Sequence, residues 1–265
     1  MSAKFSLLKV MKSRGIEVLV HGATGRGNDQ VRFQLVANML DPVTRVYAPW
    51  RDDAFLEHFG GRREMIAFCQ ARGLPIKATQ DKPYSTDANL LGLTHEAGKL
   101  EALDVPADFI EPGMGVFPKD APDDPEGFAL SVVEGRPVRI NGEEMDAVTA
   151  LLTANEVGGR NGVGIGIHTV ENRFVGIKSR GVYESPGMSL LGACYELLLQ
   201  QILDRRARRF YDSVCVALSE QIYQGYYYDL AAEMMRAALD PVKRMLTGEI
   251  SVNLYKGNVT YQSSS

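Results

Sequence analysis

Apolar positions along the first 80 residues follow two patterns, one with the period of a helix and one with the short runs of a buried strand. Residues 16–20 form a β-branched run that is typical of strands inside a parallel sheet, and residues 44–48 are interpreted as a second strand. The segments around them carry apolar residues at helical spacing. The predicted order is helix 5–13, strand 16–20, helix 28–40, strand 44–48, helix 60–72 and a third strand starting at 74–76. This alternation predicts an α/β layer with right-handed crossovers.

The pattern changes from about residue 81, where features of antiparallel structure replace the alternation. Residues 104–127 hold five prolines, which predicts a long surface connection. Further on we expect hairpins at 129–140 and 250–262, strands within 163–175, and helices at 146–157, 186–223 and 230–245, the first ended by Gly158-Gly159. The sequence therefore predicts an α/β protein with an α/β layer in residues 1–80 and an α+β region in residues 81–265.

Composition narrows the class of protein. The 265 residues are 45% apolar and 23% charged, which excludes collagen-like and wholly disordered chains. A net charge of −4 gives no general attraction to nucleic acid or anionic membranes. No uncharged stretch approaches the roughly 20 residues of a membrane span, and the three cysteines Cys69, Cys194 and Cys215 form no CxxC pair. We expect a soluble, cytoplasmic protein without nucleic-acid or membrane partners.

The turn after the first predicted strand is the first candidate site. Residues 21–28 read His-Gly-Ala-Thr-Gly-Arg-Gly-Asn. Backbone N–H groups at a glycine-rich turn before a helix favour anions. Asn28, Asp29 and Arg32 add an amide, a carboxylate and a guanidinium, and Asn28 and Arg32 share one side of the helix because they are four residues apart. The alternative is an ordinary glycine turn whose charges cap the helix.

Two later segments could line a polar cleft. Residues 84–98 carry hydroxyl groups at positions 85, 86 and 94 and carboxylates at 87 and 96; the alternative, which composition alone favours, is a loop of caps and turns. Residues 170–187 interleave charged residues with apolar ones. Because buried charges are costly unless paired, we expect several of them to pair with one another. A purely structural ion network is the alternative.

Other polar features indicate no site. Residues 205–209 hold four arginines, but Asp204 and Asp212 flank them, which is typical of a solvated helix face. The four histidines show no metal-ligand spacing with the cysteines, so no metal site is expected.

Taken together, the three candidate segments resemble the argininosuccinate synthase family. Residues 21–33 are similar to that family's His-Gly-x-Thr-Gly-Lys-Gly-Asn-Asp-Gln-Val-Arg-Phe block, with Arg26 in place of Lys. The other similar segments are 47–51 (Ala-Pro-Trp-Arg), 85–98 (Ser-x-Asp-x-Asn-Leu), 170–186 (Val-Glu-Asn-Arg to Tyr-Glu-Thr-Pro) and 254–257, a late strand. These blocks occur in family order over nearly the whole chain.

The resemblance implies a nucleotide-binding-type layer in residues 1–80 and a synthetase-like, amino-acid-binding domain in residues 81–265. It implies a ligase of arginine biosynthesis that joins citrulline to aspartate, using ATP with Mg²⁺, through a citrullyl-AMP intermediate. Gly22 would lie near the nucleotide, and Thr24, Asn28 and Asp29 would hold aspartate. The residues implied to hold citrulline are Arg32, Ser85, Thr94, Glu171 and Tyr183. Catalysis would then consist mostly of positioning and charge stabilisation.

The sequence also departs from the family pattern. It contains no Ser-Gly-Gly, the start of the family's pyrophosphate loop, and only 23 residues precede Thr24. The family also continues into an oligomerising helix beyond the point where residue 265 ends this sequence. We therefore expect a truncated member whose main ATP loop comes from a complementing subunit or another protomer. We also expect an oligomer that covers the apolar edge of strand 16–20.

Residues 94 and 95 are Thr and His where the family has Ser and Tyr, and residues 165–169 replace a segment that holds an Arg-x-Asp pair. The second change removes a charged pair near the substrate, and we expect it to alter which substrate is accepted. Two alternatives to the ligase follow. One is an ATP-independent enzyme acting on a citrulline- or aspartate-like metabolite, and the other is a non-catalytic amino-acid-binding paralogue.

Overall fold

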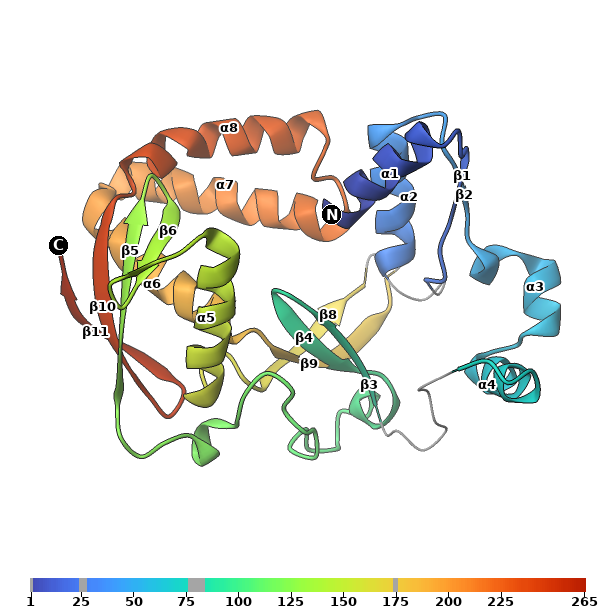
Figure 1. Ribbon diagram of the computed structural model, residues 1–265, viewed down its shortest axis with the longest axis horizontal. Helices are drawn as coiled ribbons and strands as arrows, with labels where there is room; N and C mark the ends of the chain where they lie inside the picture. The colour runs from blue at the N-terminus through green and yellow to red at the C-terminus, as the bar shows by residue number, and fades with distance from the viewer. Residues whose placement is uncertain (1, 24–27, 76–83, 174–175) are drawn as a thin grey trace. The chain divides into compact units, whose positions relative to one another are not determined.

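The computed structural model describes residues 2–23, 28–75, 84–173 and 176–265. The chain divides into two compact units (Figure 1). Unit 1 comprises Met1–Lys82, Asn172–Lys178 and Val214–Ala237, and unit 2 comprises Pro83–Glu171, Ser179–Ser213 and Ala238–Ser265. The division of the sequence at residue 80 stays a prediction.

Unit 1 contains the alternating helices and strands that the hydrophobic pattern predicts. Strands β1 (Val18–Val20) and β2 (Arg45–Tyr47) pair in parallel, which confirms the predicted parallel arrangement. The other elements of its first segment are α1 (Ser2–Ser13), α2 (Asn28–Leu40), η1 (Pro49–Arg51), α3 (Asp53–His58) and α4 (Arg62–Ala71). The predicted third strand at 74–76 is not seen in residues 74 and 75, and residue 76 lies outside the described residues.

A small apolar core holds these elements together. Leu8 and Met11 of α1 pack with Leu19 of β1 and Ala37 of α2. Burying such side chains is the main stabilising contribution to a layer of this size. The outer positions of β1 stay open, because Val18 and Val20 keep 37% and 58% of their surface exposed.

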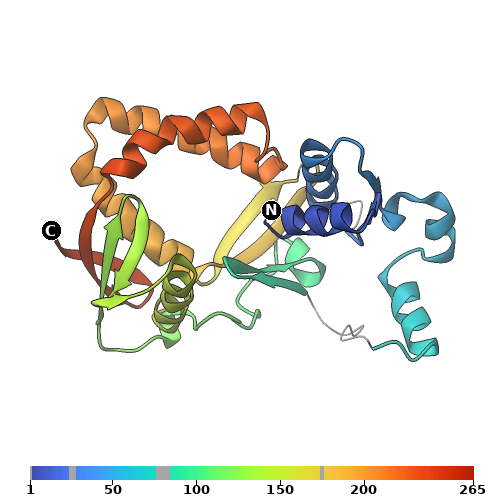
Figure 2. The same cartoon turned by 45° about the horizontal axis from the view of Figure 1, so that its top comes forward.

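The largest core lies in unit 2, on an antiparallel sheet with the strand order β11-β10-β5-β6-β7 (Figure 2). Its strands are β5 (Glu126–Val133), β6 (Arg136–Ile140), β7 (Glu143–Glu144), β10 (Gly248–Tyr255) and β11 (Asn258–Ser264). Helices α5 (Ala147–Arg160) and α6 (Pro186–Ile202) supply most of the remaining core side chains. Both predicted hairpins are confirmed. The first turns at Glu134 and Gly135 with φ of 46° and 73°, as a two-residue hairpin turn requires.

Two helix boundaries differ from the prediction. Helix α5 continues through Gly158 and Gly159, which act as close-packing positions: a Cβ on Gly159 would lie 2.0 Å from the carbonyl oxygen of Met114. The tract 186–223 is two helices, because α7 (Arg205–Gln224) begins after Asp204. The Asp204 carboxylate accepts hydrogen bonds from two backbone N–H groups of the first turn, as an N-cap does. Helix α8 (Leu230–Met245) agrees with its prediction.

A second sheet of unit 2 has the strand order β3-β4-β9-β8. Its strands are β3 (Ser85–Asn89), β4 (Gly92–Glu96), β8 (Ile167–Asn172) and β9 (Lys178–Glu184). Residues 85–96 therefore form an antiparallel hairpin, and the interpretation of this segment as a loop of caps and turns is wrong. Pairing of β4 with β9 supplies the long-range hydrogen bonds that local composition does not reveal. The connection predicted over 104–127 is irregular apart from η3 (Pro118–Asp120) and the first residues of β5. Helix η2 (Gly98–Glu101) follows β4.

Candidate substrate-binding site

Three predicted citrulline residues lie on one face of the sheet β3-β4-β9-β8. Thr94 of β4 stands opposite Tyr183 of β9. Asp87 of β3 stands opposite Thr94, and Ser85 stands opposite Glu96. Because directly opposed residues share a face and side chains alternate along each strand, all five side chains point to the same side. Each of them is at least partly exposed to solvent.

Glu171 of β8 belongs to the same face. The Nε of Arg180 donates a 3.0 Å hydrogen bond to Nε2 of His168, which places His168 on the side of the sheet where Arg180 lies. Arg180 is two residues from Val182 and therefore faces away from Tyr183. Side chains alternate along a strand, so residues 168 and 171, which are three positions apart, point to opposite faces. Glu171 therefore lies on the Tyr183 side. The sheet thus brings together all four predicted citrulline residues of unit 2.

The opposite face of this sheet is buried and fixes the strands. His95 and Glu184 are 1% and 0% exposed, and their side chains are joined by a 2.5 Å hydrogen bond from Nε2 to Oε1. The Glu184 carboxylate also accepts the backbone N–H groups of Gly113 and Met114 at 2.7 to 3.1 Å. A buried carboxylate with this many donors is well satisfied. Leu100, Ile110 and Val182 complete the core below it.

The buried charges of residues 170–187 differ from the expectation that they pair with one another. The two buried ones, Arg180 and Glu184, have partners elsewhere: Arg180 donates to His168 and to the carbonyl of Ala102, and Glu184 accepts from His95. These partners tie β9 to β8, β4 and the segment after η2. The network is thus structural on this face of the sheet, and it leaves the other face to Tyr183 and Glu171.

The remaining predicted residues belong to unit 1. Asn28 and Arg32 lie one turn apart on α2, and both contact Tyr223 at the end of α7. Nη1 of Arg32 also pairs with Asp29 Oδ1 at 3.2 Å. Gly22 precedes this helix and is exposed to solvent. Thr24 lies outside the described residues.

The segment that resembles Ala-Pro-Trp-Arg holds a second polar pair of unit 1. The Tyr47 hydroxyl donates a 2.7 Å hydrogen bond to Oδ2 of Asp52, and Asp52 caps α3. That hydrogen bond lowers the pKa of Asp52 and raises the pKa of Tyr47, because it favours the charged carboxylate and the neutral phenol. Asp52, which this hydrogen bond keeps charged, is the N-cap residue of α3.

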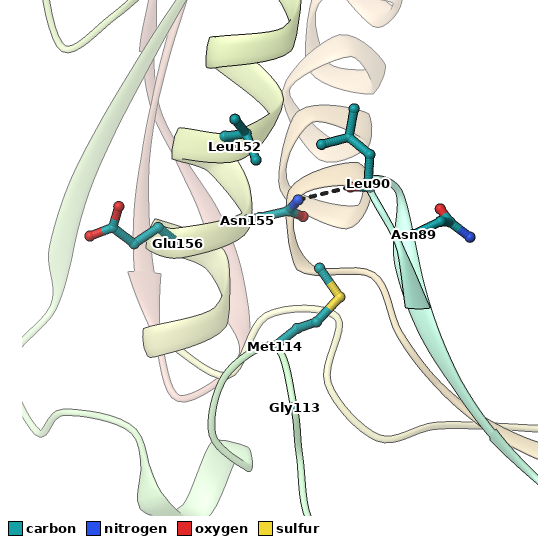
Figure 3. Close-up of a pocket in the computed structure, with 7 residues that line it drawn as sticks. All are labelled: Asn89, Leu90, Gly113, Met114, Leu152, Asn155 and Glu156. Carbon is teal, nitrogen blue, oxygen red and sulfur yellow. Dashed lines mark hydrogen bonds between the residues drawn. The ribbon is translucent and has the colours of Figure 1, made fainter. Parts of the chain in front are cut away.

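A shallow pocket of about 300 Å³ opens elsewhere in unit 2, between α5 and the β3–β4 turn (Figure 3). Asn155 crosses it: Nδ2 donates to the Leu90 carbonyl at 3.0 Å, and Oδ1 accepts the N–H of Gly187 at 2.9 Å. None of the predicted substrate residues lines this pocket. Its polar groups therefore serve the packing of α5 against the hairpin.

Among the described residues, no group of three or more His, Cys, Asp and Glu side chains could hold a metal ion. Within the same residues, no helix is long and apolar enough to cross a membrane. The candidate site carries charged and hydrogen-bonding side chains, which suit small molecules with carboxylate, ammonium and ureido groups.

Comparison with known proteins agrees with this chemistry. The family model for the arginosuccinate synthase N-terminal HUP domain matches residues 3–75, and the model for the arginosuccinate synthase C-terminal domain matches residues 84–265. The chain is 44% identical over 257 residues to the argininosuccinate synthase of Rhodopirellula baltica. The matched stretch covers 97% of this chain and 63% of the relative.

Other relatives give the same result. The argininosuccinate synthase of Carboxydothermus hydrogenoformans is 39% identical over 255 residues, covering 96% of this chain and 62% of the relative. That of Thermotoga maritima is 39% identical over 262 residues, covering 95% and 63%. The chain thus spans about 63% of the length of these curated relatives. Both family models match in the order that the resemblance predicts, and the chain belongs to the argininosuccinate synthase family.

Proposed function

We propose that this chain provides the citrulline and aspartate sites of an argininosuccinate synthase reaction. The ureido oxygen of citrulline attacks the α-phosphate of ATP, which gives citrullyl-AMP and pyrophosphate. The amine of aspartate then displaces AMP and forms the new C–N bond. The observation that carries the proposal is the shared face of Ser85, Thr94, Glu171 and Tyr183, whose opposite face is buried and held by the hydrogen bond between His95 and Glu184.

Citrulline suits this set of side chains. A carboxylate such as Glu171 can accept from an α-ammonium or a ureido N–H group. The hydroxyl groups of Ser85, Thr94 and Tyr183 can each donate and accept, which fits a ligand with a carboxylate at one end and a urea at the other. Arg32 complements them, since a guanidinium recognises a carboxylate bidentately.

Aspartate is assigned to Thr24, Asn28 and Asp29. Asn28 offers an amide and Asp29 a carboxylate, and both can accept a hydrogen bond from the amine of aspartate. The two carboxylates of aspartate need positive partners, which Arg32 and the N–H groups at the start of α2 provide. The Asp29–Arg32 ion pair supports this arrangement, because it keeps both side chains on the same turn of α2.

ATP is the third substrate of the proposal. Gly22 and the N-terminus of α2 would approach its phosphates, and Mg²⁺ would arrive with them, since this ion is usually held through phosphates and one or two carboxylates. We further propose that a complementing subunit supplies the Ser-Gly-Gly-x-Asp loop. Support comes from β1, which pairs with β2 in a two-stranded sheet of the described residues and so has a second edge to which a further strand could add.

A homo-oligomer is part of the same proposal. No residue of the 20-residue helix α7 is buried, and Phe210, Val216 and Ile222 keep 60%, 71% and 40% of their surface exposed. In the proposed oligomer, another copy would cover part of this exposed apolar surface. We also assign the chain to the cytoplasm, where amino-acid biosynthesis takes place. Light scattering tests the oligomer, and a monomer at micromolar concentration would contradict it.

The decisive experiment measures pyrophosphate release from ATP, citrulline and aspartate by the chain, with and without an added chain that carries Ser-Gly-Gly-x-Asp. Release that requires both amino acids supports the proposal. Product formation without nucleotide would instead favour the ATP-independent enzyme. Thermal stabilisation by citrulline and aspartate without any turnover would favour the binding paralogue. The structure gives a reason to prefer the ligase over the first alternative: His168, from the altered segment 165–169, contacts Arg180 on the sheet face away from Tyr183.

A further inference from the structure

Tyr223 connects the two residues of α2 that the proposed function assigns to different substrates. It lies in the last turn of α7, 195 residues from Asn28 and 191 residues from Arg32 in sequence. All three residues belong to unit 1. No substrate-binding role is assigned to Tyr223 by the motifs of the sequence.

The hydroxyl group of Tyr223 sets the orientation of the Asn28 amide. It donates its single proton to the carbonyl oxygen of Asn172 at 3.2 Å, and it accepts a 2.7 Å hydrogen bond from Nδ2 of Asn28. Because a tyrosine hydroxyl has only one proton, its bond to Asn172 requires that the NH₂ end of Asn28 face Tyr223. The carbonyl Oδ1 of Asn28 is thereby turned away from Tyr223.

The ring and backbone of Tyr223 hold the Arg32 guanidinium. The guanidinium lies over the Tyr223 ring, 4.8 Å from its centroid, and Nε donates a 2.6 Å hydrogen bond to the Tyr223 carbonyl oxygen. Stacking fixes the plane of the guanidinium, and Nη1 donates a further hydrogen bond of 3.2 Å to Asp29 Oδ1. The chain then passes close to Arg32 at Gly225, where a Cβ would lie 3.1 Å from the Arg32 Cα.

We propose that Tyr223 is a positioning residue for both amino-acid substrates, acting on aspartate through its hydroxyl group and on citrulline through its ring. The inference rests on the proposed function, since it needs Asn28 and Arg32 to bind those substrates. It separates the two roles by atom: the hydroxyl is hydrogen-bonded to Asn28, and the ring stacks on Arg32. Preorganised side chains bind more tightly because less orientational freedom is lost on binding.

Two variants and one control test it, with the affinity for aspartate and for citrulline each measured by calorimetry on the full chain. Tyr223→Phe removes only the hydroxyl, so we expect aspartate to bind about tenfold more weakly and citrulline to stay within about twofold. Tyr223→Leu also removes the ring, so we expect both affinities to fall about tenfold.

The control is Tyr227→Leu. Arg236 stacks over the Tyr227 ring at 4.4 Å and donates to the Tyr227 carbonyl oxygen, which repeats the Arg32 arrangement without contact to a predicted substrate residue. This variant should lose a similar amount of thermal stability and keep both affinities.

The outcomes separate the inference from the proposed function. If the wild-type chain binds neither amino acid, the proposed sites fail and the inference fails with them. If the wild-type chain binds both, three results overturn the inference alone: unchanged affinities in both Tyr223 variants, an equal loss of both affinities in Tyr223→Phe, or the same losses in Tyr227→Leu.

Discussion

Thr94 and Tyr183 stand directly opposite each other on the antiparallel strands β4 and β9. Their neighbours along the same two strands, His95 and Val182, form the next opposed pair and point into the core. One pair of strands therefore carries proposed substrate groups on one side and the packing that fixes their spacing on the other.

Removing the hydroxyl groups of this pair tests the citrulline assignment. Thr94→Val and Tyr183→Phe keep the shape of each side chain, so we expect the free energy of unfolding to change by less than about 0.5 kcal/mol. Citrulline should bind roughly five- to tenfold more weakly in each variant, because one hydrogen bond to the ligand is lost. Titration calorimetry measures the affinity. Tyr261→Phe, on the half-exposed face of β11, is the matched control and should bind citrulline as the wild type does.

Glu184→Gln tests the buried face. Both carboxylate oxygens accept backbone N–H groups, so the amide NH₂ would face a donor whichever way it turns. We expect the free energy of unfolding to fall by about 2–4 kcal/mol. Urea unfolding gives the value. Glu196→Gln removes a carboxylate from a more exposed ion pair with Arg208 and should cost less than about 1 kcal/mol; equal losses in the two variants would refute the burial argument.

The same substitution should have opposite effects at two helical glycines. Gly159→Ala places a methyl group 2.0 Å from the Met114 carbonyl oxygen, so we expect a loss of about 1–3 kcal/mol or more. Gly192→Ala, in α6, meets nothing within 4 Å and should gain up to about 1 kcal/mol from helix propensity. Thermal and urea unfolding of both variants measure the difference. A stabilised Gly159→Ala variant would show that α5 does not approach residues 114–115 this closely.

Acid should weaken the packing of α5 against β5. Hydrogen bonds from Arg160 and Asn161 lower the pKa of Glu126 below its ordinary value. Since the folded pKa is lower than the unfolded one, this stabilisation is present above the unfolded pKa and is lost as the pH falls through the folded pKa. Unfolding free energies measured between pH 6 and about pH 3 should fall less steeply for Glu126→Gln than for the wild type. Glu143→Gln, at an exposed position of β7, should follow the wild-type curve.

The sequence predicted the elements whose bounds depend on residues close together in the chain. The hairpin at Glu134–Gly135 follows from its turn residues and strand β1 from its β-branched run, and the helix expected from residue 146 is α5. The break before α7 could have been found as well, since Asp204 is an N-cap in sequence. The prediction that Gly158 and Gly159 end α5 is wrong, because a glycine can either end a helix or allow another backbone segment to pack closely against it. Only the folded structure distinguishes these two roles.

Only part of the candidate site could be predicted, because the rest depends on residues that are far apart in the sequence. Residues 85–96 look like a polar loop because one face of their hairpin is exposed; the alternation of Leu93 and His95 with Thr94 and Glu96 is the signal that composition hides. Motifs named Asn28 and Arg32, but nothing local connects them with Tyr223, which is about 190 residues away. Long-range partners of this kind need the folded chain.

The polypeptide passes between the two units five times, after residues 82, 171, 178, 213 and 237. Unit 1 is therefore not a contiguous stretch of sequence, although the two family models meet between residues 75 and 84. A protein expressed as residues 1–82 would lack Tyr223 and Asn172, and one expressed as residues 83–265 would carry Tyr223 without the helix α2 that it contacts. The same holds for chimaeras made from two relatives. The contact between Asn28 and Tyr223 should be kept only when residues 214–237 come from the same parent as Asn28.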